Sequence, residues 1–256
     1  MLTSENFLAI ENQLLRGLPP KELGHLLPGL EQVTLSSGDV LYEPGGPLEY
    51  FYFLTSCIVS LVYTMDTGVS ADIGLVGNEG VVGIALFLGG CTMVNRAVVQ
   101  VGGRALRIGA RALLEQFRGA GALHDLLLRY TQAFMTQTCQ TAACNRLHCL
   151  EQRLCRWILL CHDRLQCNEL LMTQEALANM LGGRRQSVTV AAGQLQDAGL
   201  IQYRRGHIQI VDRKGIEKTA CECYGAVRRE YDRLLGPPCS RQVRTSAAER
   251  GNPAAR

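Results

Sequence analysis

Cationic, amide and hydroxyl side chains follow a glycine pair in the stretch NMLGGRRQSV at residues 179–188. The guanidinium groups of Arg184 and Arg185 can donate paired hydrogen bonds to a guanine edge, and the amide of Gln186 can pair with adenine. Hydroxyl and guanidinium groups also bind phosphate oxygens. Residues of these types, so close together, predict recognition of a nucleic acid.

The elements on either side of this stretch predict a helix-turn-helix. TQEALANM and SVTVAAGQLQ both have helical periodicity, and the glycine pair between them ends the first helix with a tight turn. Thr173 is the expected N-cap of the first helix. The run IQYRRGHIQIV that follows predicts a β-hairpin wing with arginines at its tip. The residues predicted to contact DNA are Thr173, Arg184, Arg185, Gln186, Ser187, Thr189, Arg204, Arg205 and His207.

Charge is distributed unevenly along the chain. The 256 residues carry a net charge of +3, but residues 1–142 hold 8 Lys and Arg against 12 Asp and Glu, a net of −4. Residues 143–256 hold 18 against 11, a net of +7. A basic second half indicates a polyanionic partner for that half, and the alternative is a solvated basic surface.

Short runs of aromatic and branched residues, separated by glycine turns, occupy residues 33–108. YFYFL, CIVSLVY and RAVVQV are such runs, and SSGD, EPGGP, MDTG and GNEG are the turn signals between them. This spacing favours an all-β sandwich or barrel. The phosphate-binding patterns GxGxxG and GxxxxGK[ST] are absent, which argues against a parallel nucleotide-binding sheet.

Helical periodicity begins near Ala110 and continues through a long helix. Leu123, Leu127, Tyr130 and Phe134 recur there at alternating spacings of four and three, as in the seam of a two-stranded coiled coil. We expect these four side chains to form a dimer seam, and the alternative is packing within one chain. CLEQRLCRWILLCHDRL predicts a further helix.

The eleven cysteines are expected to be reduced and mostly buried. Cys144 with His148, and Cys221 with Cys223, have spacings that metal ligands also show. The chain contains no CxxC pair, however, and buried helical side chains explain these residues more simply. We therefore expect no metal site and no cofactor.

Several classes of protein are disfavoured by missing patterns. No apolar run reaches the roughly 20 residues that a membrane span requires, and the N-terminus lacks the pattern of a signal peptide. We expect a cytoplasmic protein without a membrane partner. The motifs GxSxG and HExxH are absent, so we expect neither catalytic residues nor an enzyme. A β-roll module that anchors another protein is a weaker alternative, because it would not need arginines concentrated at one helix start and one hairpin tip.

The chain resembles the Crp/Fnr family of bacterial transcription regulators over about residues 10–235. The resemblance lies in GDVLYEPG, in GNEGVVG, in the long helix and most specifically in MTQEALANMLGGRRQSVTVAAGQLQDAGLIQYRRGHIQI. It implies an α+β fold. The implied parts are a double-stranded β-helix (jelly-roll) domain of the cyclic-nucleotide-binding kind at 10–118, a dimerisation helix at 119–148, a winged helix-turn-helix domain at 149–235 and a disordered tail at 236–256.

The resemblance also implies a homodimer that binds a palindromic operator in double-stranded DNA, with RNA polymerase and a small-molecule effector as further partners. Family members that bind cyclic nucleotides use a Gly-Glu pair and a later Arg-Ser pair, and the matching ligand-pocket positions here are Gly83 with Ile84 and Arg96 with Ala97. Ile84 cannot accept a hydrogen bond from a ribose, so the resemblance does not identify the effector. Sensing of a metal or of thiol redox state is the alternative input. Val190 stands where the family commonly has a second base-reading arginine.

Overall fold

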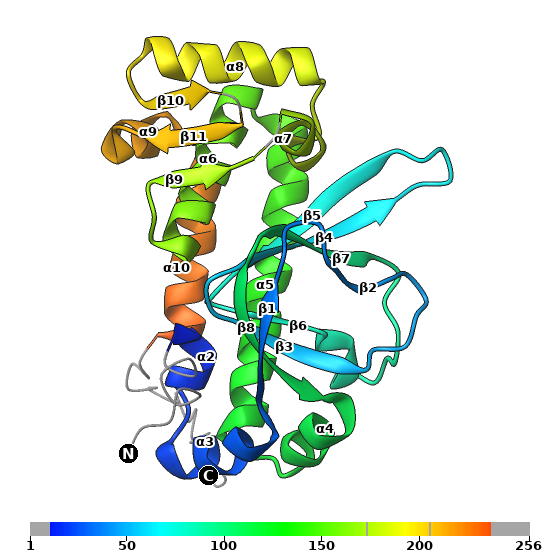
Figure 1. Ribbon diagram of the computed structural model, residues 1–256. Coiled ribbons are helices and arrows are strands. Elements are labelled where there is room, and N and C mark those ends of the chain that lie inside the picture. Colours follow the sequence, from blue (N-terminus) through cyan, green and yellow to red (C-terminus); the bar gives the residue numbers. More distant parts are fainter. Residues whose placement is uncertain (1–10, 173, 205, 237–256) are drawn as a thin grey trace, which may run out of the picture.

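The computed structural model describes residues 11–172, 174–204 and 206–236. Figure 1 shows three parts: a β-roll, a long helix that crosses it, and a helical unit with a small sheet at one end of that helix. The mixture of helix and sheet confirms the predicted α+β class. Thr173, Arg205 and the predicted tail from residue 237 onward lie outside the described residues. Within those ranges, no helix has the length and apolar character needed to cross a membrane.

The β-roll consists of two four-stranded antiparallel sheets, with strand orders β1-β8-β3-β6 and β2-β7-β4-β5. Branched and aromatic residues predominate in its strands because they fit a pleated surface that is buried on one face. Phe51, Phe53 and Val59 are buried in its core. The strands are β1 (Glu31–Leu35), β2 (Val40–Tyr42), β3 (Tyr50–Leu54), β4 (Ile58–Thr64), β5 (Ser70–Val76), β6 (Val81–Val82), β7 (Arg96–Val101) and β8 (Gly103–Gly109).

Short helices close the ends of the roll. Asn12 anchors the N-terminal ones, because its side-chain oxygen accepts hydrogen bonds from the backbone of Leu14 and Leu15. Its amide nitrogen donates to the carbonyl oxygens of Leu54 and Gly80 within the roll. The closing elements are α2 (Gln13–Arg16), α3 (Pro20–Leu26), η1 (Leu27–Gly29), η2 (Ile84–Leu86) and α4 (Ala110–Arg118).

Helix α5 (Ala122–Leu147) packs one of its faces directly onto the roll. Gly74 of β5 lies against the Phe134 ring, and a Cβ at that glycine would stand 2.5 Å from the ring. Gly80 lies against Tyr130 in the same way, and the Tyr130 hydroxyl donates to the carbonyl oxygen of Val81. The missing side chains of the two glycines let the roll approach the helix closely.

The structure contradicts the predicted dimer seam and favours the alternative, packing within one chain. Leu123, Leu127, Tyr130 and Phe134 are all buried within their own chain, in the same core as the roll. The spacing of four and three correctly indicated a buried stripe. The β-roll covers that stripe, however, and no second helix is needed to bury it.

A second stripe with the same spacing lies on the exposed face of α5. Leu128 and Met135 stand on it and expose 42% and 60% of their surface. Apolar side chains repeated at this spacing are typical of a coiled-coil seam. We call these residues the outer stripe of α5: Leu128, Gln132, Met135, Cys139 and Ala142.

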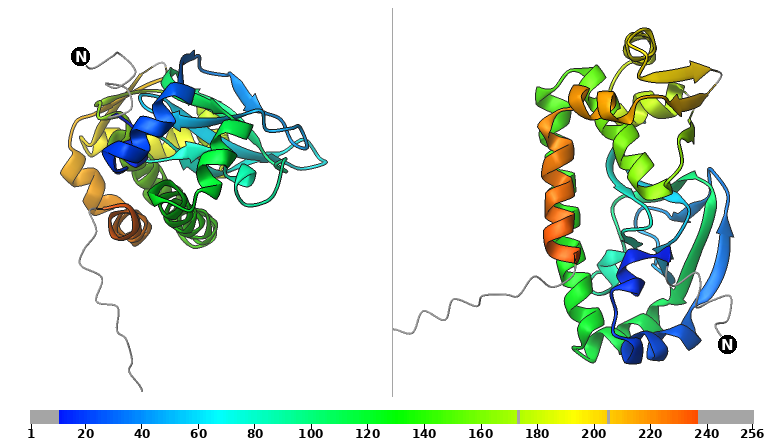
Figure 2. Two further views of the ribbon diagram at one scale, coloured as in Figure 1. Left: turned by 90° about the horizontal axis from the view of Figure 1, so that it is seen from below. Right: turned by 90° about the vertical axis from the view of Figure 1, so that its left-hand side faces the viewer.

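The second half of the chain forms a helical unit around a three-stranded sheet with the order β10-β11-β9. Its core contains Trp157, Ile158, Leu195 and Ile208. The last helix, α10, turns back and runs along α5, as both views in Figure 2 agree. The elements are α6 (Leu150–Leu165), β9 (Glu169–Leu171), α7 (Gln174–Leu181), α8 (Arg185–Asp197), β10 (Ile201–Arg204), β11 (His207–Ile210), α9 (Arg213–Thr219) and α10 (Glu222–Leu235).

Candidate nucleic-acid interface

Glycines build the turn between α7 and α8. Gly182 has a φ of +57°, in the left-handed region that glycine adopts without strain. Gly183 approaches α6 so closely that a Cβ would lie 3.0 Å from the Leu150 side chain. Arg153 of α6 donates a 2.8 Å hydrogen bond to the carbonyl oxygen of Leu181, at the C-terminal end of α7. The predicted helix-turn-helix is therefore held firmly against α6.

Helix α8 buries one face and presents a polar face to solvent. Val188, Ala191 and Leu195 are buried in the helical unit. Figure 1 shows α8 at the end of the molecule opposite α3 and α4, with nothing drawn beyond it. The predicted contact residues in and just before α8 are all exposed, namely Arg184, Arg185, Gln186, Ser187 and Thr189.

The first two turns of α8 combine positive charge with one exposed apolar group. Arg185 opens the helix, and its Nε lies 3.4 Å from the side-chain oxygen of Gln174 in α7. The first turn of α8 contains no acidic residue. Val190 is 61% exposed further along the helix. An exposed aliphatic side chain can contact the C5-methyl group of thymine, so this surface offers groups for more than one kind of base.

Strands β10 and β11 form the predicted wing. Arg204 is exposed at its tip. The backbone N–H of Tyr203 donates a 2.9 Å hydrogen bond to the side chain of Gln196, which connects the wing to α8. His207 Nδ1 lies 2.8 Å from a carboxylate oxygen of Glu169 on β9. Among the ion pairs of the described residues, none joins Arg204 to a carboxylate, whereas His207 lies beside the carboxylate of Glu169.

The four predicted ligand-pocket residues lie in and around the roll. Gly83 precedes η2 with a φ of +107°, and Ile84 packs against the core of the roll. Ala97 is buried on β7. The Arg96 guanidinium donates a 2.9 Å hydrogen bond to Glu43. The charge of Arg96 is thus balanced by a carboxylate, as expected for a structural ion pair.

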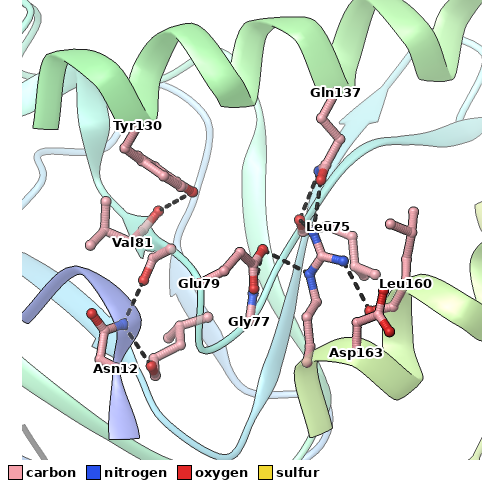
Figure 3. A network of polar contacts seen from close by, with 12 residues as sticks. Asn12, Leu75, Gly77, Glu79, Val81, Tyr130, Gln137, Leu160 and Asp163 are labelled. Carbon is pink, nitrogen blue, oxygen red and sulfur yellow. Dashed lines mark hydrogen bonds and ion pairs between the residues drawn. The ribbon is translucent and has the colours of Figure 1, made fainter. Parts of the chain in front are cut away.

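A buried ion pair joins the roll to α6. Arg164 Nε donates to Glu79 Oε1 at 2.7 Å, and the two side chains are only 5% and 9% exposed. Arg164 also donates to Gln137 Oε1 at 2.7 Å and to the carbonyl oxygen of Leu160 at 2.9 Å. Figure 3 shows Glu79 and Gln137 converging on this point from the roll and from α5. One guanidinium therefore links the roll, the long helix and the helical unit.

Two residue pairs that are far apart in the sequence meet in the fold. Cys144 and His148 at the end of α5 face Cys221 and Cys223 at the start of α10, and their four potential ligand atoms lie within 4.8 Å of one another. The sequence alone explains these residues as buried helical side chains and does not place the two pairs together. In the structure they form a single group, which we call the Cys/His cluster.

Asp72 of β5 is an unusual carboxylate between the two halves of the chain. It lines a cavity of about 40 Å³ that residues of α5, α6 and α7 also line. Burial raises the pKa of Asp72 to about 6, whereas an aspartate in an unfolded chain has a pKa of about 3.9. The folded protein therefore loses stability when this group ionises. The loss begins above the unfolded pKa and is complete once the pH has risen through the folded pKa.

We expect Asp72→Asn to be more stable than the wild type by about 2 kcal/mol above pH 7, because the variant mimics the neutral carboxyl group. The difference should shrink as the pH falls through 6 and vanish near pH 4. Urea denaturation at a series of pH values measures this. Asp66→Asn, at the exposed tip of the same hairpin, is the matched control. Equal stability of Asp72→Asn and wild type at pH 8 would contradict the prediction.

The fold and the exposed surface of α8 define a class of protein, a β-roll joined through a long helix to a winged helix-turn-helix. Known families match both halves. The cyclic nucleotide-binding domain matches residues 32–119, and the Crp-like helix-turn-helix domain matches residues 152–219. These matches together cover more than half of the chain. The chain belongs to the Crp/Fnr family and is a DNA-binding transcription regulator of that type.

Solved regulators share this fold. The c-di-GMP responsive global regulator CLP of Xanthomonas campestris is 17% identical, with a TM-score of 0.62 over 76% of this chain and 100% of that one. FixK2 of Bradyrhizobium japonicum is 15% identical, with a TM-score of 0.62 over 75% and 98%. A CRP/FNR family transcriptional regulator of Thermus thermophilus, TTHA1359, is 24% identical, with a TM-score of 0.58 over 74% and 98%. The comparison with curated protein sequences finds no match.

Proposed function

We propose that the protein is a cytoplasmic homodimer that binds a palindromic operator in double-stranded DNA. Each protomer places α8 in the major groove and its wing on the adjacent sugar-phosphate backbone. The observation that carries this proposal is the outer face of α8, where cationic, amide and hydroxyl side chains are exposed together while the opposite face is buried. An α-helix fits the major groove, and these side chains match its donors and acceptors.

The predicted contact residues divide between two roles. Arg185 and Gln186 are proposed to read base edges, because they stand in the first turn of α8, which meets the bases in this mode of docking. The remaining residues are proposed to bind phosphate oxygens and so to position the helix. They are Thr173, Arg184, Ser187, Thr189, Arg204, Arg205 and His207.

Gel mobility-shift titrations of the full chain test the function. We expect binding to random duplex DNA whose affinity falls steeply with salt, by a slope of about −0.9 per phosphate neutralised in a plot of log affinity against log salt concentration. Selection from a random-sequence library should then enrich palindromic sites with half-sites about 34 Å apart. Failure to bind any duplex at low salt would overturn the proposed function.

The outer stripe of α5 is the proposed dimer interface. Its exposed apolar residues Leu128 and Met135 lie one heptad apart, and Cys139 and Ala142 continue the repeat. Two such stripes from two protomers pack side by side in a parallel coiled coil. Pairing of α5 with its copy sets the two α8 helices at one fixed separation, as a palindrome requires.

Met135→Asp is expected to give monomers, because a carboxylate in the seam of a coiled coil is desolvated without a partner. Sedimentation velocity measures the change in mass. The monomers should retain the far-ultraviolet circular dichroism of the wild type, since Met135 is exposed in the isolated chain. Val94→Asp replaces an exposed apolar residue of the roll and serves as the control, which should stay dimeric. A dimeric Met135→Asp variant would place the interface elsewhere.

The signal is proposed to enter through a small-molecule effector at the roll, and RNA polymerase is the proposed protein partner in transcription. The contacts of Arg164 with Glu79 and Gln137 support coupling between the parts, because they span the roll, α5 and α6. Ile84 and the pairing of Arg96 with Glu43 argue against a cyclic nucleotide as the effector. A metal ion or the thiol redox state is the second candidate signal, because the Cys/His cluster lies at the junction of α5 with the helical unit.

A further inference from the structure

The Cys/His cluster contains three thiols and one imidazole in a compact arrangement. Cys144 Sγ and Cys221 Sγ are 3.5 Å apart, and Cys223 Sγ lies 3.5 Å from His148 Nδ1. The three cysteines are between 0% and 4% exposed and form a separate buried group. Two elements supply all four side chains: the last turn and C-cap of α5, and the N-cap and first turn of α10.

These spacings fit tetrahedral coordination of one ion. A tetrahedral Zn²⁺ with bonds of about 2.3 Å to sulfur holds its ligand atoms roughly 3.8 Å apart. The two distances of 3.5 Å, and the upper limit of 4.8 Å over all four atoms, require only small side-chain adjustments to reach that geometry. Magnesium and calcium prefer oxygen ligands, so a set of three sulfurs and one nitrogen excludes them.

Groups around the cluster orient the ligands as they do in metal sites. His148 Nε2 lies 3.3 Å from a carboxylate oxygen of Glu222, which leaves Nδ1 facing the sulfur of Cys223. A metal-binding histidine typically directs its other nitrogen to a carboxylate in this way. Gln140 Nε2 donates a hydrogen bond to Cys223 Sγ at 3.1 Å.

We propose that Cys144, His148, Cys221 and Cys223 bind one Zn²⁺ ion per chain. The ion bonds to three thiolate sulfurs and to His148 Nδ1, and each thiol that is still protonated releases its proton on binding. No position is left open for a substrate, so the site is structural rather than catalytic.

The position of the site gives it a mechanical role. His148 is the C-cap of α5, and α6 begins two residues later. Helix α10 is the last helix of the same helical unit. A Zn²⁺ ion therefore fixes α10, the last helix of the unit, to the C-terminal end of α5. The helical unit begins beside this point, with α6. Loss of the ion by chelation frees α10 from this constraint. The site requires neither dimerisation nor DNA binding.

Metal analysis of the full chain, purified under reducing and oxygen-free conditions, tests the proposal. We expect one zinc per chain that a chromophoric chelator removes only slowly. Replacement by Co²⁺ should give the intense ligand-field bands of a tetrahedral ion together with thiolate-to-cobalt charge-transfer bands. Cys221→Ser and Cys223→Ser should lose stoichiometric zinc, whereas Cys167→Ser, which removes an exposed cysteine of the same half, should keep it.

Glu222→Gln provides a test that does not depend on the folding of a cysteine variant, because the Glu222 side chain is largely exposed. Loss of the carboxylate beside His148 should weaken zinc affinity by about tenfold. Octahedral cobalt spectra, zinc that is substoichiometric and freely exchanged, or a Cys144–Cys221 disulfide in the oxygen-free protein would each overturn the proposal. Operator binding measured on the same samples is a separate readout, so a failure of the zinc site and a failure of DNA recognition are distinguishable.

Discussion

Glu79→Gln is expected to lower the free energy of unfolding by about 3 kcal/mol, because it leaves the buried Arg164 guanidinium without its counter-charge. The remaining hydrogen bonds of Arg164, to the Gln137 side chain and to the carbonyl oxygens of Leu160 and Leu75, supply no negative charge. Equilibrium unfolding in urea measures the loss. Replacing both partners by apolar residues, as in Glu79→Leu with Arg164→Met, should recover much of the stability, since no charge is then buried.

Glu43→Gln is the matched control for this prediction. It also removes a carboxylate that pairs with an arginine, but Glu43 and Arg96 are both well exposed to solvent. Solvent-exposed pairs contribute roughly 0–1 kcal/mol, so this variant should unfold almost like the wild type. If the two variants lose equal free energy of unfolding, burial is not the reason that the Arg164–Glu79 pair stabilises the fold.

The second large effect is on DNA recognition. If Arg185 reads a guanine, Arg185→Ala should cost about 1–3 kcal/mol of binding energy and relax the preference at one position of each half-site. Arg204→Ala should instead weaken binding to every sequence alike and make the salt dependence less steep, because a phosphate contact carries no sequence information. Fluorescence anisotropy with a panel of single-base operator variants separates the two outcomes.

Arg111→Ala is the control for both arginine variants. Its side chain is 94% exposed on α4, in the half of the chain remote from α8. Its removal should leave the affinity and the sequence preference unchanged. Should Arg185→Ala bind its operator as tightly as the wild type, the assignment of α8 as the reading helix is wrong.

The parts of the fold that depend on local sequence were predictable. Glycine turns and branched runs indicated the β-roll, and the glycine pair before Arg184 indicated the helix-turn-helix, because these signals act within a few residues. The face of α5 that the roll covers was not predictable in this way. An apolar stripe shows that something covers it but not what. Gly74 and Gly80, whose missing side chains let the roll cover it, lie 60 residues before Phe134 and 50 residues before Tyr130.

The Cys/His cluster and the Arg164 network were missed for the same reason. Cys144 with His148 and Cys221 with Cys223 each have a spacing that metal ligands show, but only the return of α10 along α5 brings the two pairs together. Arg164 stands in the last turn of α6, where an arginine ordinarily lies in solvent and interacts with the helix dipole. Its burial depends on the carboxylate of Glu79 in the β5–β6 loop. No local sequence pattern shows that this loop lies against α6.

The return of α10 along α5 also bears on how the chain melts. A domain attached by one linker unfolds as an independent unit, whereas a domain whose last helix packs into its neighbour loses that packing when either one unfolds. Tyr231 of α10 lies edge-on to Tyr130 at a ring distance of 6.5 Å, so the core of the first half includes a side chain from the end of the second. We therefore expect the two halves, although they match two separate domain families, to unfold as one cooperative unit.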